Sequence, residues 1–103
     1  MNDSVKETIL SLLKLDLGIT HNLRDAYFSN VIESTSKEIE TMGVTLNLES
    51  VEDQMLVVEY SAWNYRNRHV NIPLSRSIQF KIHNRLIKKA GKPDAIIEIK
   101  FGE

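Results

Sequence analysis

Apolar residues recur at helical spacing in four segments of the chain. In the first segment one apolar stripe contains Val5, Ile9, Leu12 and Leu13, and in the second Phe28 and Ile32 share one face. Steps of three and four residues place side chains on one side of an α-helix. The four segments cover about 5–15, 23–42, 51–68 and 73–90. We therefore expect a single mainly α domain, a small four-helix bundle-like fold.

Capping residues mark the ends of these segments. Glu7 follows Ser4 by three residues, the spacing of a capping box, in which each side chain bonds the free backbone N–H of the other residue. Asp53 follows Ser50 at the same spacing. Pro73 suits a first helical turn, because the N–H that proline lacks would be unbonded there. The segments end at Gly18, Gly43 and Gly91, the last followed by Pro93.

The third segment is apolar on two sides. One stripe contains Val51, Met55, Val58, Ala62 and Tyr65, and the other contains Leu56, Tyr60 and Trp63. A helix with two apolar sides buries both. The pattern predicts either the central helix of the domain or a helix shared with a neighbouring chain, and it favours the central helix.

The fourth segment has an apolar strip in addition to its core stripe. The core stripe is Leu74, Ile78, Ile82 and Leu86. Phe80 and Ile87 lie roughly opposite this stripe, seven residues apart. A small domain has no second core to cover such a strip, so we expect it to meet another chain.

Basic residues line one edge of the same segment. Lys81, Arg85 and Lys88 follow i, i+4, i+7 spacing, and Lys89 lies beside them. Such an edge can meet DNA phosphates without reading base sequence. Alternatively, the lysines at the end of the segment complement the helix dipole. The sequence supports the two interpretations equally.

The C-terminal residues alternate as in a half-buried strand. Ile97, Ile99 and Phe101 alternate with polar Glu98 and Lys100 within an extended tail at 95–101. A single strand needs a partner, which would be the alternating segment 44–48 or a neighbouring subunit.

Charge is divided unevenly along the 103 residues. Residues 1–62 contain eleven acidic side chains against four basic ones, whereas residues 63–103 contain nine basic against three acidic. This division favours head-to-tail self-association or contact with a polyanion, unless it arose by chance along a short chain. No apolar run reaches the roughly 18 residues of a membrane span, and the polar start predicts synthesis in the cytoplasm.

The sequence offers no residue set for catalysis or for a cofactor. Cysteine is absent, which excludes disulfides and a thiol nucleophile. The histidines, His21, His69 and His83, do not have metal-ligand spacing. Glycine-rich phosphate loops and nucleophile elbows are missing. We therefore expect a protein that is not an enzyme and holds no metal or cofactor.

The middle of the chain resembles the head–tail connector proteins of long-tailed bacteriophages, also called adaptor or head-completion proteins. The similarity lies in residues 56–68, LVVEYSAWNYRNR, followed by a polar turn, by 72–76, IPLSR, and by 84–86, NRL. The short first helix, the turn at 17–19 and the long second helix closing at 42–43 agree in kind. The strand-like tail departs from the family pattern.

The resemblance implies a structural virion protein, made in the bacterial cytoplasm, that forms a ring at the portal vertex. Such a ring joins head to tail, extends the DNA exit channel and contacts the portal protein and a stopper or tail-completion protein. Its subunits can be monomeric before assembly. The candidate interface residues are Trp63, Tyr65, Arg66, Arg68, Phe80, Ile87, Ile97, Ile99 and Phe101, and the candidate DNA-facing residues are Lys81, Arg85, Lys88 and Lys89. The alternative is a small helical nucleic-acid-binding or regulatory protein that uses the basic edge.

Overall fold

The computed structural model describes residues 1–91, which form four helices and no strand. The helices are α1 (Asp3–Leu17), α2 (Asp25–Thr41), α3 (Val51–Arg66) and α4 (Arg76–Gly91). The mainly α, four-helix prediction is confirmed for this part of the chain. The strand predicted at 95–101 lies outside the described residues.

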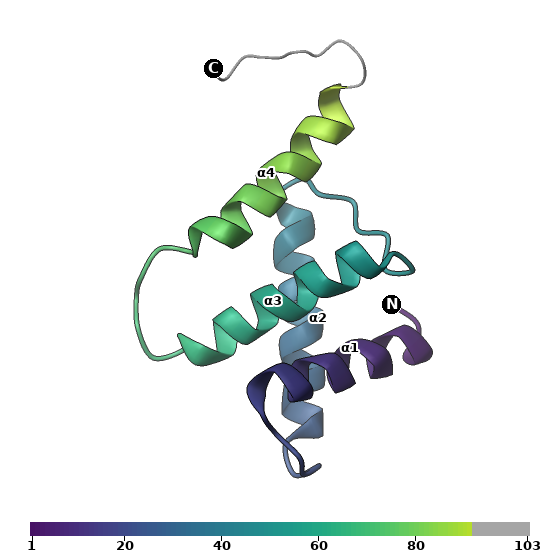
Figure 1. The fold of residues 1–103 in the computed structure, drawn as a ribbon, viewed down its shortest axis with the longest axis vertical. Coiled ribbons are helices and arrows are strands. Elements are labelled where there is room, and N and C mark those ends of the chain that lie inside the picture. The colour runs from purple at the N-terminus through teal and green to yellow at the C-terminus, as the bar shows by residue number, and fades with distance from the viewer. Residues whose placement is uncertain (92–103) are drawn as a thin grey trace.

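The helices are arranged around α3 (Figure 1). α1 and α3 lie side by side and both pack against α2. α4 packs on the other side of α3, and its C-terminal half extends away from the other helices. Because α3 contacts all three other helices, the two-sided apolar pattern is explained by its central position.

The core draws on all four helices. Its fully buried side chains include Ile9 and Leu13 of α1, Phe28 of α2, Leu56 of α3 and Ile78 of α4. Each of these was on an apolar stripe of the sequence, because a stripe at helical spacing is what a packed helix must turn inward. Tyr60 and Ala62 of α3 are also buried, on its two opposite stripes.

Two residues at the start of α3 depart from the stripe. Val51 is 70% exposed and Met55 45% exposed, although both were expected to be buried. They border an open groove between the first turns of α3 and the later turns of α4, where Asn84 and Lys88 form the facing wall. Leu23, expected in the second helix, precedes α2 and is also exposed.

Neither predicted capping box forms. Asn2 caps α1, because its side-chain oxygen accepts a hydrogen bond from the Val5 N–H at 2.8 Å, and Ser4 lies inside the helix. Ser50 precedes α3 without a side-chain capping bond. The carboxylate of Asp53 bonds instead to the Asn47 N–H and to Arg85. At α3 the acidic side chain that the capping box requires is therefore bonded elsewhere.

α4 begins three residues later than predicted. Its N-cap is Ser75, whose hydroxyl oxygen accepts a hydrogen bond from the Ile78 N–H at 3.2 Å. Pro73 belongs to the connection from α3, and Leu74 packs against the core from that connection. The first four backbone N–H groups of a helix have no partner within the helix. A serine at the N-cap accepts a hydrogen bond from one of them, and a proline side chain cannot.

The connection from α2 to α3 alternates between buried and exposed residues. Val44 is buried and Leu46 and Leu48 are partly buried, whereas the residues between them are exposed. The predicted alternation at 44–48 is therefore confirmed in burial. Gly43 begins this segment with a φ of 100°, and a Cβ there would lie 3.3 Å from Cδ2 of Leu86 in α4. The positive φ favours glycine here, and a Cβ would also be in tight contact with the Leu86 side chain.

Candidate functional site

The outer face of α4 carries an uncovered apolar strip. Phe80 is 65% exposed and Ile87 41% exposed, and they lie opposite the buried Ile78 and Ile82. Single exposed apolar residues are common on monomers. Phe80 and Ile87 instead share one face of a projecting helix, opposite the core stripe, where the sequence placed them.

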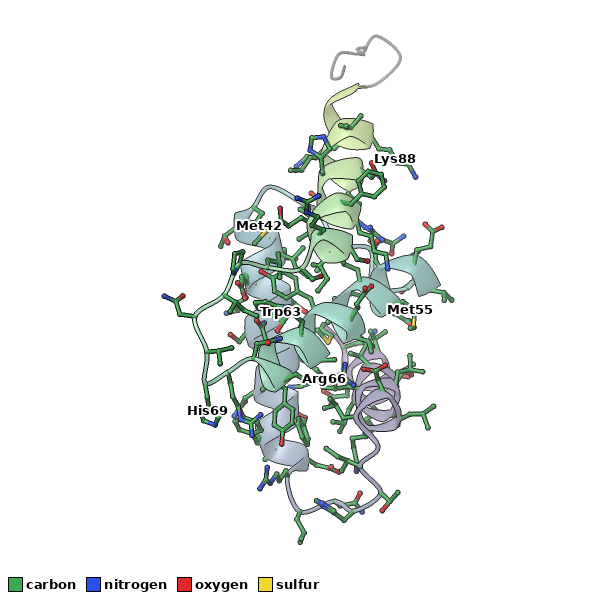
Figure 2. All side chains as sticks on the ribbon, turned by 60° about the vertical axis from the view of Figure 1, so that its left-hand side comes forward. Met42, Met55, Trp63, Arg66, His69 and Lys88 are labelled. Atoms are coloured by element: carbon green, nitrogen blue, oxygen red, sulfur yellow. The ribbon has the colours of Figure 1, made fainter. Side chains whose placement is uncertain are left out.

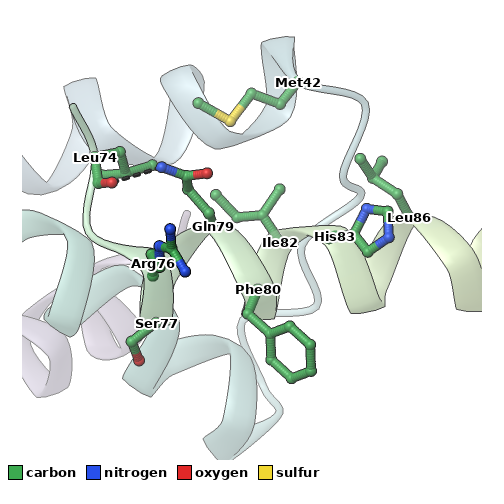
Figure 3. A pocket seen from close by; sticks show the side chains of 9 residues that line it. All are labelled: Met42, Leu74, Arg76, Ser77, Gln79, Phe80, Ile82, His83 and Leu86. Carbon is green, nitrogen blue, oxygen red and sulfur yellow. Dashed lines mark hydrogen bonds between the residues drawn. The ribbon is translucent and has the colours of Figure 1, made fainter. Parts of the chain in front are cut away.

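An open groove lies beside this strip, between α4 and the C-terminal end of α2 (Figure 3). We call it the α4 groove; its lining residues are Met42, Leu74, Arg76, Ser77, Gln79, Phe80, Ile82, His83 and Leu86, around about 970 Å³. Met42 faces Ile82 and Leu86 across it, and Phe80 points away from Met42 at its outer edge. The Gln79 side chain donates to the Leu74 carbonyl at 2.6 Å, closing one end.

The basic edge of α4 is largely engaged within the chain. Arg85 Nε lies 2.9 Å from Asp53 Oδ1, and both side chains are mostly buried. Lys81 pairs with Glu59, and Lys89 Nζ donates to the Gly43 carbonyl at 2.9 Å. These bonds attach α4 to α3 and to the end of α2.

Lys88 differs from its three neighbours on this edge. It makes no hydrogen bond or ion pair with any residue in 1–91, and its side chain points away from the domain (Figure 2). Of the four candidate DNA-facing residues, it alone combines exposure with freedom from a partner in the described chain.

Asp53 has a role that the sequence did not reveal. Its two carboxylate oxygens accept from Arg85 Nε and, at 2.8 Å, from the Asn47 N–H. Arg85 also donates to the Glu52 carbonyl at 3.2 Å. Asp53 therefore joins α3, α4 and the 44–48 connection. The sequence could not predict this ion pair, because Asp53 and Arg85 are 32 residues apart.

The candidate interface residues at the end of α3 contact their own chain. The Tyr65 ring centroid lies 5.1 Å from that of Phe28, and the Arg68 guanidinium lies 3.9 Å above the Tyr65 ring. Arg66 pairs with Asp16 of α1 at 3.3 Å. Trp63 is partly buried against the core. These contacts fold the end of α3 against α1 and α2, so the structure separates this group from the strip on α4.

A polar cluster joins α2 and α3 beside this group. The Tyr60 hydroxyl donates to Glu38 at 2.8 Å, and the Asn64 amide donates to Thr35 at 3.0 Å. Burial, and then the bonded Glu38 carboxylate, raise the pKa of Tyr60 above its ordinary value. A tyrosine held protonated in this way supports a structural hydrogen bond rather than proton transfer at neutral pH.

The histidines within residues 1–91 lie apart from one another. His21 lies ahead of α2 and accepts from the Leu23 N–H, His69 lies in the α3–α4 connection, and His83 lies on α4. Within the described residues, no three histidine or acidic side chains gather as a metal site would require. None of the helices in this range is long and apolar enough to cross a membrane.

The remaining candidates, Ile97, Ile99 and Phe101, lie outside the described residues. Among known proteins, no family model, no curated sequence and no solved structure matches this chain.

Proposed function

We propose that this chain is a structural assembly protein of the phage head–tail connector type, forming a ring at the portal vertex. The observation that carries the proposal is the uncovered strip of Phe80 and Ile87 on a helix that projects from the domain. A projecting helix with an apolar outer face suits contact with another protein. The sequence resemblance supplies the kind of assembly.

The proposed partners follow from the same resemblance. The portal protein would bind one side of the ring, and a stopper or tail-completion protein would bind the other. A head-to-tail contact between identical subunits closes into a ring when its rotation permits. The site of action would be the head–tail interface of the virion.

The engaged basic edge weighs against the nucleic-acid alternative. Arg85 and Lys81 already have acidic partners, so contact with phosphates would cost those ion pairs. A DNA channel needs a surface along which DNA slides, and weak phosphate contact from Lys88 is compatible with that.

The test compares Phe80→Asp with Asn84→Asp, which introduces the same charge at an exposed position of the same helix. The tagged chain and both variants are used to capture partners from lysate of the source at moderate and high salt. We expect identified portal or tail-completion proteins to remain bound to the wild type and to Asn84→Asp at high salt, because apolar contacts persist there. Phe80→Asp should lose them while circular dichroism shows it folded.

Two outcomes would contradict the proposal. If folded Phe80→Asp still binds those partners, the apolar strip of α4 is not the interface. Capture of nucleic acid alone, lost at high salt, would instead support the phosphate-binding alternative.

A further inference from the structure

The α4 groove exposes apolar side chains that nothing in residues 1–91 covers. Met42 is 38% exposed on one wall, and Leu74 and Leu86 are partly buried on the other. The charged or titratable residues along it are Arg76 and His83, and no described acidic side chain lines it. An occupant that fits would be apolar on one side and carry acidic residues.

We propose that residues 95–101 of this same chain fold back along α4 and fill the α4 groove. This segment places Ile97, Ile99 and Phe101 on one side of an alternating pattern. Within residues 95–101, Glu98 can pair with Arg76 on the groove, and the segment carries one base, Lys100. The inference does not depend on the proposed function.

The lengths agree. From Arg76 to Leu86 the groove follows ten residues of helix, about 15 Å at a rise of about 1.5 Å per residue. Residues 95–101 in extended form span about 20 Å. The helix ends at Gly91, about 7.5 Å beyond Leu86, and three extended residues can cover about 10 Å on the way back.

The other partner within the chain, segment 44–48, has backbone groups engaged at its C-terminal end. A strand pairing with 44–48 needs free backbone groups there. The Asn47 N–H bonds to Asp53 and the Asn47 carbonyl accepts from the Ser50 N–H at 2.9 Å. The Leu48 carbonyl accepts from the Gln54 side chain at 2.8 Å. The groove therefore fits the tail better than this edge does.

A second copy is a weaker occupant than the chain's own tail. A short flexible connection gives a tethered segment an effective concentration on the order of millimolar. A free copy at micromolar concentration cannot compete with that for a modest apolar groove.

Cysteine cross-linking tests the proposal without background, since the sequence contains no cysteine. Gln79→Cys with Ile99→Cys places one thiol in the groove and one on the tail. The control joins Ile99→Cys to Asn84→Cys, on the opposite flank of α4. Under mild oxidation, the disulfide between the cysteines at 79 and 99 should form within one chain at least about tenfold faster than the control disulfide. A docked tail holds these two thiols close together.

A third variant tests the groove itself. Met42→Asp, added to the Gln79–Ile99 pair, should reduce its rate to that of the control, and circular dichroism should show that it remains folded. Equal rates for the groove and control pairs would overturn the proposal. Cross-linked dimers, formed faster as protein concentration rises, would overturn it by showing that the groove takes the tail of a second copy.

Discussion

Asp53→Asn removes the charge from the junction that holds α4 to the domain. The wild-type carboxylate accepts from Arg85 and from the Asn47 N–H at 2.9 and 2.8 Å, and its side chain is 15% exposed. A hydrogen bond to a charged group contributes about 1.5–3 kcal/mol. Asparagine keeps one acceptor oxygen and leaves Arg85 without its counter-ion. We expect the free energy of unfolding to fall by about 2 kcal/mol, which lowers Tm by on the order of 10 °C in a domain of this size.

Glu59→Gln provides the matched control. It also removes one negative charge from α3 facing α4, but Glu59 and its partner Lys81 are much more exposed than Asp53 and Arg85. Exposed pairs contribute about 0–1 kcal/mol, so we expect a loss of about 0.5 kcal/mol or less. Urea unfolding followed by circular dichroism at neutral pH measures both.

A double-mutant cycle with Arg85→Gln isolates the pair itself. The coupling free energy between Asp53→Asn and Arg85→Gln should be about 1 kcal/mol or more, because the two groups are in direct contact. Equal losses for Asp53→Asn and Glu59→Gln, or a coupling near zero, would refute the structural role assigned to this edge of α4.

Three further predictions concern the core and its connections. Gly43→Ala should cost about 1–3 kcal/mol in a urea melt, since φ is 100° and its Cβ would crowd Leu86; a loss no larger than that of Gly18→Ala, where the space is open, would contradict the crowding. Because burial raises the pKa of Tyr60, the native state keeps this proton after the unfolded chain loses it, so stability should be full below about pH 10 and fall above it. The free energy of unfolding of Tyr60→Phe should decrease less over the same pH range. An identical decrease in the wild type and the variant would exclude Tyr60 as the cause. Phe28→Ala should lower the free energy of unfolding by about 3–5 kcal/mol, as truncation leaves a cavity in the core, and an unchanged urea midpoint would contradict its full burial.

Periodicity predicted the helices well because it is a local property. Ile9, Phe28, Leu56 and Ile78 lie on the stripes that the spacing identified, and all are buried. The ends of the helices were predicted less well. The sequence named Ser4 as the cap of the first helix and Pro73 as the start of the fourth, whereas Asn2 and Ser75 cap these helices in the structure.

The candidate site was predicted in part. The sequence placed Phe80 and Ile87 opposite the core stripe of the fourth helix, and they are exposed there. It also grouped Lys81 and Arg85 as a basic edge, but could not show their acidic partners. The α4 groove has no signature in the sequence, because Met42 and Leu86 meet across it from helices far apart in the chain.

The sequence by itself determined four amphipathic helices, the two apolar sides of the third and the second apolar strip on the fourth. Each follows from the spacing of apolar residues within one helix. The tertiary structure alone decided how the divided charge is used. Acidic side chains of α3, among them Asp53 and Glu59, meet basic ones of α4 because the two helices pack together. Coulombic attraction depends on distance in space, which separation along the chain does not reveal.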